Sequence, residues 1–216
     1  MSSLWAVVPI KPLYRAKSRL AEVLSPEQRY QFAETMLRHL LTVLGKVPQI
    51  TGTLVISRDT KALAIARDLG AKTIQESNPS DLNPALARAT EVARVWGAGA
   101  VLILPADLPF ITAEDVENLA DLGVNAMSVV IAPDRAEDGT NAMLVRPAGL
   151  IPYSYGVASY ERHITAAKAA GADVKVYESD TLNLDIDIPS DLDEYNRLVA
   201  DGYSDLLPLF LPDTAS

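Results

Sequence analysis

The 216-residue sequence contains no cysteine and only two histidines, His39 and His163. The lack of cysteine excludes disulfide bonds, Cys-ligated zinc or iron–sulfur sites, and thiol catalysis. The two histidines have no suitably spaced carboxylate, so there is no zinc signature, and no Ser–His–Asp order with a nucleophile elbow is visible. The chemistry is therefore not expected to depend on a thiol, a zinc ion or a serine nucleophile.

Other absences narrow the class of protein. No apolar run is long enough to span a bilayer, and Lys11 comes too early for the core of a signal peptide, so we expect a cytoplasmic protein without membrane contact. The net charge of −9 argues against a protein that coats nucleic acid. The absence of the GxxxxGK[ST] and GxGxxG motifs argues against a P-loop ATPase and a Rossmann dehydrogenase.

Short apolar strands alternate with amphipathic helices along most of the chain. Ala100–Leu104 (AVLIL) is apolar throughout, as expected for a central strand of a parallel sheet, and Ser25-Pro26-Glu27-Gln28 starts a helix that ends near Leu44. The order predicts a single α/β domain over residues 1–216, a three-layer αβα fold with a mostly parallel sheet, in which the tail after about residue 202 is peripheral. Ligands of such sheets bind at the carboxyl ends of strands, near a topological switch point.

Four local expectations concern the segments around these strand ends. Asn83 is expected to cap a helix reaching about Trp96, and Ser190 to cap the last helix. The segment 134–141 is expected to be a polar loop between two strands, and Leu182–Ile186 a strand.

Acidic residues follow two of the predicted strands. Asp107 comes directly after the central strand, and Asp185 and Asp187 alternate along a late one, so both are expected on the same face. If the late strand lies beside the central one, Asp107 and Asp187 can hold one Mg²⁺ from two sides. The alternative, an ordinary turn acid and an exposed strand end, has equal weight on spacing alone.

Basic and polar residues supply a complementary set. Residues 11–19 contain Lys11, Arg15, Lys17 and Arg19 and no acid, and we expect Lys17 and Arg19 in particular to neutralise phosphate oxygens. A solvated surface loop is the alternative.

A second polar set lies later in the chain. Thr140 and Asn141 can donate hydrogen bonds to a phosphate or carboxylate, and Gly156 and Ser159 open a helix whose free N–H groups would seat an anion. An ordinary helix cap is favoured from these residues alone. His163, one turn after Ser159, faces the same way, and a structural role is preferred for it.

Taken together, these segments resemble one family. The sequence is similar to the 2-phospho-L-lactate guanylyltransferases, also known as phosphoenolpyruvate guanylyltransferases, which act in coenzyme F-420 biosynthesis. The matching stretches, spread from near residue 5 to about residue 196, are VVPIKPLYRAKSRLAEVLSPEQR, VIS, LNPAL, LPADLPF, VVIAPDRAEDGTNAMLVRP, YGVASYERH and LDIDIPSDLDEY. PDRxxDGTNA is the most specific of these, whereas DxDxPxDL also occurs in other sugar-nucleotide transferases. The glycine-rich nucleotide loop of the wider superfamily is replaced by VPIKPLYRAKSR.

The resemblance implies a nucleotide-diphospho-sugar-transferase-like fold and Mg²⁺-dependent transfer of GMP from GTP to the phosphate of 2-phospho-L-lactate or phosphoenolpyruvate, with release of pyrophosphate. The resemblance also implies roles for individual residues. Asp107, which is also catalytic, and Asp187 would bind the metal, with Asp185 beside them, and Lys17 and Arg19 would bind the triphosphate, with Lys11 behind. Guanine and ribose would bind near Ser57, Leu82 and Asn83, and the acceptor would be bound by Thr140, Gly156 and Ser159, next to Asn141.

Alternatives remain open at this stage. The acceptor can be 3-phospho-D-glycerate, a molybdopterin or a sugar 1-phosphate on the same fold, or the chain can be a non-catalytic nucleotide-binding protein. The apolar stretch at 206–212 is as compatible with packing on a second copy as on its own domain, so a homodimer is also open.

Overall fold

The computed structural model describes residues 3–76, 81–203 and 208–211. Within these residues one seven-stranded sheet has the order β3-β2-β1-β4-β6-β5-β7. Its strands are β1 (Leu4–Pro9), β2 (Ile50–Ser57), β3 (Lys72–Gln75), β4 (Ala100–Ile103), β5 (Ser128–Pro133), β6 (Thr140–Arg146) and β7 (Asp173–Val176). The helices are α1 (Pro26–Leu44), α2 (Thr60–Asp68), α3 (Leu82–Val95), α4 (Ala113–Leu122), α5 (Ser159–Ala169) and α6 (Pro189–Ala200), with 3₁₀ turns η1 (Leu13–Arg15) and η2 (Ser18–Leu20).

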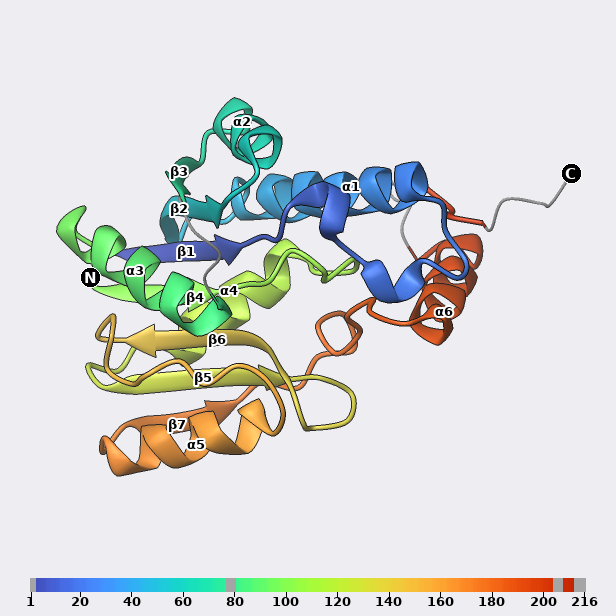
Figure 1. The fold of residues 1–216 in the computed structure, drawn as a ribbon. Coiled ribbons are helices and arrows are strands. Elements are labelled where there is room, and N and C mark those ends of the chain that lie inside the picture. The colour runs from blue at the N-terminus through green and yellow to red at the C-terminus, as the bar shows by residue number, and fades with distance from the viewer. Residues whose placement is uncertain (1–2, 77–80, 204–207, 212–216) are drawn as a thin grey trace, which may run out of the picture.

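The sheet has its topological switch point between β1 and β4. From β1 the chain runs outward through β2 to β3, then returns to place β4 on the other side of β1, and all of these pairs are parallel. β6 is antiparallel to both β4 and β5, and β7 is parallel to β5. The prediction of a mostly parallel sheet with 100–104 at its centre is therefore confirmed. The loops after β1 and β4 emerge on either side of the switch point (Figure 1).

Helices cover both faces of the sheet, which gives the three layers expected. One apolar cluster joins the sheet to α1, α2 and α4, and a second joins it to α3 and α5. In the second cluster Trp5 and Val7 of β1 pack with Leu86 and Ala89 of α3. No helix in the described part of the chain is long and apolar enough to cross a membrane.

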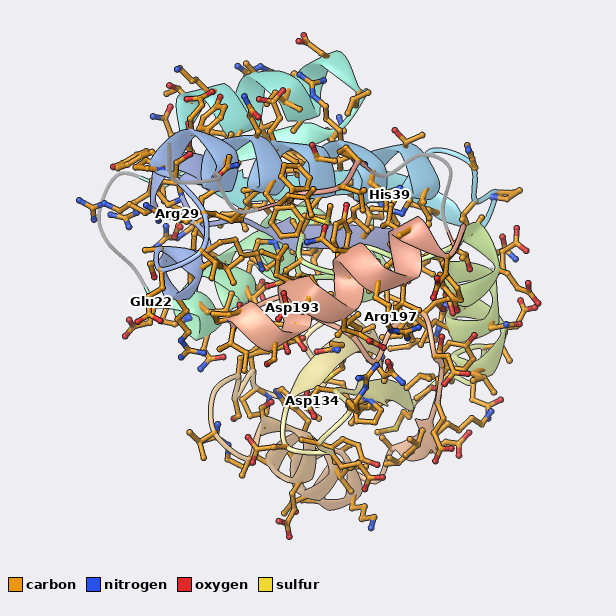
Figure 2. The ribbon with its side chains drawn as sticks, turned by 90° about the vertical axis from the view of Figure 1, so that its right-hand side faces the viewer. Glu22, Arg29, His39, Asp134, Asp193 and Arg197 are labelled. Carbon is orange, nitrogen blue, oxygen red and sulfur yellow. The ribbon has the colours of Figure 1, made fainter. Side chains whose placement is uncertain are left out.

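α6 forms a separate third cluster at the carboxyl end of the central strands. Figure 2 shows α6 crossing this end of the molecule, with Asp193 and Arg197 along it. Its buried Tyr195 packs edge-on against Phe32 of α1, with ring centroids 5.3 Å apart. Phe210 packs edge-on against the same Phe32 at 4.7 Å, so residues 208–211 of the tail are docked on the domain. The rest of the apolar stretch lies outside the described residues.

The segment Leu182–Ile186 does not pair as a strand of the sheet, contrary to the prediction, although buried and less buried residues alternate along it. Leu182, Leu184 and Ile186 are buried and the residues between them are not, as in an extended segment. Its backbone groups bond to loops and side chains instead of a neighbouring strand: the carbonyl of Leu182 accepts from the Asn141 side chain, and that of Asn183 from the Arg135 N–H. Asp185 and Asp187 still share a face.

Three other local expectations are corrected. α3 begins one residue before Asn83, with Asp81 as its N-cap. α6 begins before Ser190, and the Asp191 carboxylate accepts from the backbone N–H groups just ahead of it. Thr140 and Asn141 are not in a loop but open β6, where Thr140 pairs with Pro133 at the end of β5 and Asn141 lies at a register irregularity before Ala142.

Candidate active site

The basic loop after β1 is tied to the adjoining turn by the buried Asp59. Its Oδ1 accepts hydrogen bonds from the backbone N–H groups of Lys61 and Ala62 at the start of α2, at 2.8 and 3.4 Å. Its Oδ2 accepts one from the backbone N–H of Leu13 at 2.8 Å. The same carboxylate therefore caps α2 and fixes where the basic loop begins.

Lys17 has a left-handed backbone conformation, with φ of 54°. This region costs a non-glycine residue about 1–2 kcal/mol. In the part of the chain that the structure describes, the other non-glycine residues with positive φ are Glu137 and Ala158. All three lie in the loops that sequence analysis selects for function, and such strained residues cluster at functional sites.

The Lys17 ammonium lies between two carboxylates. Its Nζ is 3.3 Å from Asp107 Oδ2 and 3.6 Å from Asp187 Oδ1. The Lys17 side chain is only 7% exposed, against 32% and 48% for the two acids. Since Lys17 follows β1 and Asp107 follows β4, the two meet at the switch point, and Asp187 joins them from the segment before α6.

Arg19 is the outer member of this cluster. Its Nη1 is 3.4 Å from Asp187 Oδ2, but its side chain is 71% exposed. An exposed pair of this kind contributes little in water because solvent and salt screen it. Lys11 is exposed at the end of β1. Of the three cations Lys17, Arg19 and Lys11, the Lys17 ammonium is therefore the one whose interactions solvent screens least.

Asp185 is the third acid of the cluster. Burial, and then the neighbouring carboxylates Asp107 and Asp187, raise the pKa of Asp185 to about 6, while Lys17 opposes the shift. Three carboxylates thus sit near a single buried ammonium. The local excess of negative charge favours a further cation.

By its chemistry, the acidic pair suits a hard divalent cation. Carboxylate oxygens from two separate segments face one positive charge. Among the described residues no three His, Asp or Glu side chains are grouped closely enough to enclose a metal alone. Mg²⁺ commonly takes one or two carboxylates and fills its other positions with water and phosphate oxygens. Asp107 and Asp187 are suitable for that role, with Asp185 next to them.

A buried aspartate on α4 positions the acidic segment. Asp115 Oδ1 accepts hydrogen bonds from the hydroxyls of Tyr177 and Ser179, at 3.1 and 2.7 Å. Its Oδ2 accepts from the Thr112 hydroxyl and backbone N–H, at 2.7 and 2.9 Å, and from the Thr181 hydroxyl at 2.6 Å. Burial acts to raise the pKa of Asp115, but the hydrogen bonds from Thr112, Thr181 and Ser179 outweigh it, so the pKa is lowered. Asp115 therefore holds residues 177–181, just ahead of Asp185 and Asp187.

Replacing Asp115 with alanine is expected to destabilise the fold. Four hydroxyls would lose their buried acceptor, which costs about 3 kcal/mol in the free energy of unfolding and lowers Tm by about 6–12 °C. Thermal denaturation followed by circular dichroism measures this. Asp121→Ala, which removes an exposed acid from the same helix, is the control and should shift Tm by about 2 °C or less. Equal shifts in the two variants would contradict the structural role.

A second polar cluster joins β6 to α5. Thr140 Oγ1 is 3.0 Å from His163 Nδ1 and 3.2 Å from Ser159 Oγ, and all three residues are buried. His163 Nε2 accepts the backbone N–H of Ser154 at 2.9 Å. The next residue of β6, Asn141, points the other way and donates to the carbonyl of Leu182 at 2.7 Å. Adjacent residues of one strand thus connect this cluster to the acidic segment.

The start of α5 is less open than expected. Asp138 accepts the backbone N–H of Ala158 through Oδ1, at 3.2 Å, and that of Tyr160 through its carbonyl, at 3.1 Å. The N–H of Ser159 donates to the carbonyl of Gly156. Several N–H groups of the predicted anion seat are therefore engaged, and the side chains around Thr140 are the remaining polar groups.

The residues assigned to guanine and ribose bond to segments beside the two clusters and not to the cluster side chains themselves. Ser57 is buried and its Oγ accepts the N–H of Asp59 at 3.0 Å. Asn83 forms two hydrogen bonds with the backbone of Tyr155, accepting its N–H at 2.7 Å and donating to its carbonyl at 3.2 Å. Leu82 is exposed beside it. Asn83 thus ties the start of α3 to the loop that contains Gly156.

Sequence reasoning missed the three aspartates that position these groups. Asp59 had a readable signal, since it precedes a helix as an N-cap. Asp115 follows Thr112 at the spacing of a capping box, which the structure contains, but that local signal does not predict its bonds to Ser179 and Thr181. Nothing in the sequence pairs Asp138 with the start of α5, because the two lie 20 residues apart.

Comparison with known proteins identifies relatives over nearly the whole chain. Residues 4–203 match the family described as "Guanylyl transferase CofC like". A phosphoenolpyruvate guanylyltransferase of Rubrobacter xylanophilus is 42% identical over 200 residues, covering 93% of this chain and 95% of the relative. A 2-phospho-L-lactate guanylyltransferase of Methanothermobacter thermautotrophicus is 36% identical over 189 residues, covering 88% and 82%.

Solved structures share the fold at low sequence identity. A nucleotidyl transferase from Methanothermobacter thermautotrophicus has a TM-score of 0.66 at 14% identity, covering 94% of this chain and 98% of that one. A CMP:2-keto-3-deoxy-manno-octonic acid synthetase complexed with CTP has a TM-score of 0.64 at 18% identity, covering 93% and 100%. The fold is therefore of the nucleotide-diphospho-sugar-transferase type, as expected from the sequence.

Proposed function

The chain belongs to the CofC-like guanylyl transferase family, and from that premise we propose that it transfers GMP from GTP to the phosphate of phosphoenolpyruvate or 2-phospho-L-lactate. This is the reaction of coenzyme F-420 biosynthesis that the sequence resemblance implies. The observation that carries the proposal is the meeting of Lys17, Asp107 and Asp187 at the switch point between β1 and β4. Residues 4–203 act as one nucleotidyltransferase domain.

The reaction needs no nucleophile from the protein. An oxygen of the acceptor phosphate attacks the α-phosphorus of GTP in line, and the bond from that phosphorus to the bridging oxygen of the β-phosphate breaks. Pyrophosphate leaves with the bonding electrons. Because the attacking oxygen is already anionic, no general base is required. The protein's task is to offset the repulsion between two polyanions and to align them.

Lys17 contributes most of the positive charge that offsets the repulsion between the two polyanions. Its ammonium is nearly excluded from water, so its attraction for phosphate is screened less than that of an exposed cation. Arg19 and Lys11 extend the positive charge along the triphosphate, from the outer side of the loop and the end of β1. The backbone of the loop is already fixed by Asp59, so the cations are presented without a large ordering cost.

Asp107 and Asp187 would hold Mg²⁺, with Asp185 as a neighbouring third acid. When bound, such an ion neutralises phosphate charge and polarises the phosphorus under attack. Asp115 and Asn141 serve this pair by fixing the segment that carries Asp185 and Asp187.

The acceptor is bound at the second cluster. Thr140, Ser159 and the backbone at Gly156 line this site, with the Ser159 hydroxyl donating to Thr140 Oγ1, and Asn141 supports the strand from the opposite face. Guanine and ribose bind near Ser57, Leu82 and Asn83 at the carboxyl end of β2 and the start of α3. Since Asn83 also holds Tyr155, nucleotide and acceptor sites share a rigid connection.

A substrate matrix tests the proposal. The protein is incubated with Mg²⁺ and each of GTP, ATP, CTP and UTP, against each of phosphoenolpyruvate, 2-phospho-L-lactate, 3-phospho-D-glycerate and a sugar 1-phosphate, and pyrophosphate release is measured. We expect release with GTP and one of the first two acids. Release only with another acceptor would replace the substrate assignment. No release in any combination, with GTP binding intact, would indicate a non-catalytic nucleotide-binding protein.

A further inference from the structure

His163 is a buried titratable residue that the reaction does not use. It lies in α5, one turn after Ser159, and faces the start of β6. The Tyr155 ring packs edge-on against its imidazole, with centroids 4.9 Å apart. Both ring nitrogens have polar partners, so its orientation and its tautomer are both determined.

The backbone N–H of Ser154 defines the tautomer. A backbone N–H can only donate, so His163 Nε2, at 2.9 Å from it, must be an acceptor. In a neutral imidazole the other nitrogen then carries the hydrogen. Nδ1–H therefore donates to Thr140 Oγ1 at 3.0 Å.

This tautomer dictates what the Thr140 hydroxyl can do. A hydroxyl has one hydrogen and two acceptor positions. Thr140 Oγ1 accepts from His163 Nδ1–H and from the Ser159 hydroxyl, so both acceptor positions are filled. Its own hydrogen is left as a donor, pointing to neither of these neighbours.

We propose that His163 is a positioning residue that makes the Thr140 hydroxyl a fixed hydrogen-bond donor to an anionic oxygen of the acceptor, a role that rests on the proposed function of this cluster. A hydroxyl that can rotate recognises donors and acceptors alike. One whose acceptor positions are occupied selects for phosphate or carboxylate oxygen.

The surroundings keep His163 in the required form. Burial, and then the charge of Arg162, lower the pKa of His163 to about 4, so the imidazole is neutral at pH 7. Protonation would place a hydrogen on Nε2, so that two donors, Nε2–H and the Ser154 N–H, would face each other and their hydrogen bond would be lost. The other histidine has the opposite tautomer: His39 Nε2 lies 3.0 Å from the carbonyl of Ile111 and must donate to it. His39 is therefore an internal reference.

Nitrogen-15 NMR of the wild-type protein tests the tautomer directly. With only two histidines, long-range ¹H–¹⁵N spectra at pH 7 should show one Nδ1–H ring, which disappears in the His163→Gln variant, and one Nε2–H ring. An Nε2–H tautomer at His163 would overturn the proposal before any variant is assayed.

Two variants separate the two hydrogen bonds of the ring. The side-chain N–H₂ of His163→Asn can replace Nδ1–H and donate to Thr140, whereas the carbonyl of His163→Gln can replace Nε2 and accept from Ser154. Phosphoenolpyruvate is the probe, titrated into each variant with Mg²⁺ and a GTP analogue whose α,β bridge is methylene. We expect the Kd for the probe to rise about tenfold in His163→Gln and less than about threefold in His163→Asn, the difference of one oriented hydrogen bond.

Thr140→Val completes the test. Because His163 acts through Thr140, His163→Gln should weaken binding of the probe no further once Thr140 is valine. The reverse ranking of the two His163 variants, or additive effects with Thr140→Val, would show that His163 only anchors the loop. The analogue cannot react, so these measurements are independent of turnover. Binding in the expected order without pyrophosphate release from GTP would sink the proposed function and leave this inference standing.

Discussion

Replacing Asp107 with asparagine is expected to lower kcat for GMP transfer about 10³-fold, the size of effect seen when one preorganised charge-stabilising group is lost. Asparagine keeps the size of the side chain and removes the charge that faces Lys17 across 3.3 Å. The ammonium keeps its second partner, Asp187, at 3.6 Å. Stability should therefore change by about 1 kcal/mol or less, a Tm shift of roughly 2–4 °C.

The control removes the same charge from the same end of the molecule. Asp193 is exposed on α6 (Figure 2), and Asp193→Asn should leave kcat within about twofold of wild type, since exposed charges act weakly through water. Steady-state pyrophosphate release and thermal denaturation are measured on both variants. A wild-type rate in Asp107→Asn would remove the basis for metal binding at this position. A large fall in Tm would mean that lost activity reflects unfolding.

Local signals determined most of the fold in advance. α1 begins and ends where the capping box at Ser25 and the apolar side of the helix predict, because caps and periodicity act within a few residues. The switch-point rule for parallel sheets also predicts that Lys17 and Asp107 lie at the same edge of the sheet, although 90 residues separate them in sequence. Both follow from sequence order and strand polarity alone.

The two largest failures, at Leu182–Ile186 and at the start of β6, share a cause in long-range hydrogen bonding. Leu182–Ile186 alternates like a strand, but Asn141 and Arg135 take its carbonyls, so no ladder forms. The start of β6 is predicted as loop from the sequence because Thr140 and Asn141 are polar. Their polar atoms are satisfied by His163, Ser159 and Leu182, and no periodic pattern contains those pairings. Polar residues buried for a site break the rule that strands are apolar inside.

Lys17→Met should reduce kcat/KM for GTP about 10²–10³-fold, more than any other change in the basic loop. Methionine fills similar space without the charge, so the loss reports the ammonium. Burial sets the ranking: Lys17 is 7% exposed, and Arg19, at 71%, should cost about tenfold when replaced by methionine. Arg15 lies exposed in the same loop, with its guanidinium over the Tyr14 ring, and Arg15→Met is the matched control, expected within about threefold of wild type.

The same variant separates the two roles of the Lys17 charge. With nucleotide absent, the ammonium competes with Mg²⁺ for Asp107 and Asp187, so Lys17→Met should bind Mg²⁺ more tightly than wild type in calorimetry while turning over far more slowly. Lys17→Arg should recover little activity, because a planar guanidinium does not replace a compact ammonium between two carboxylates. Weaker Mg²⁺ binding in Lys17→Met would mean that ion and ammonium do not share those acids. The buried lysine would then act on the triphosphate alone, and the metal would have to be sought elsewhere at the switch point.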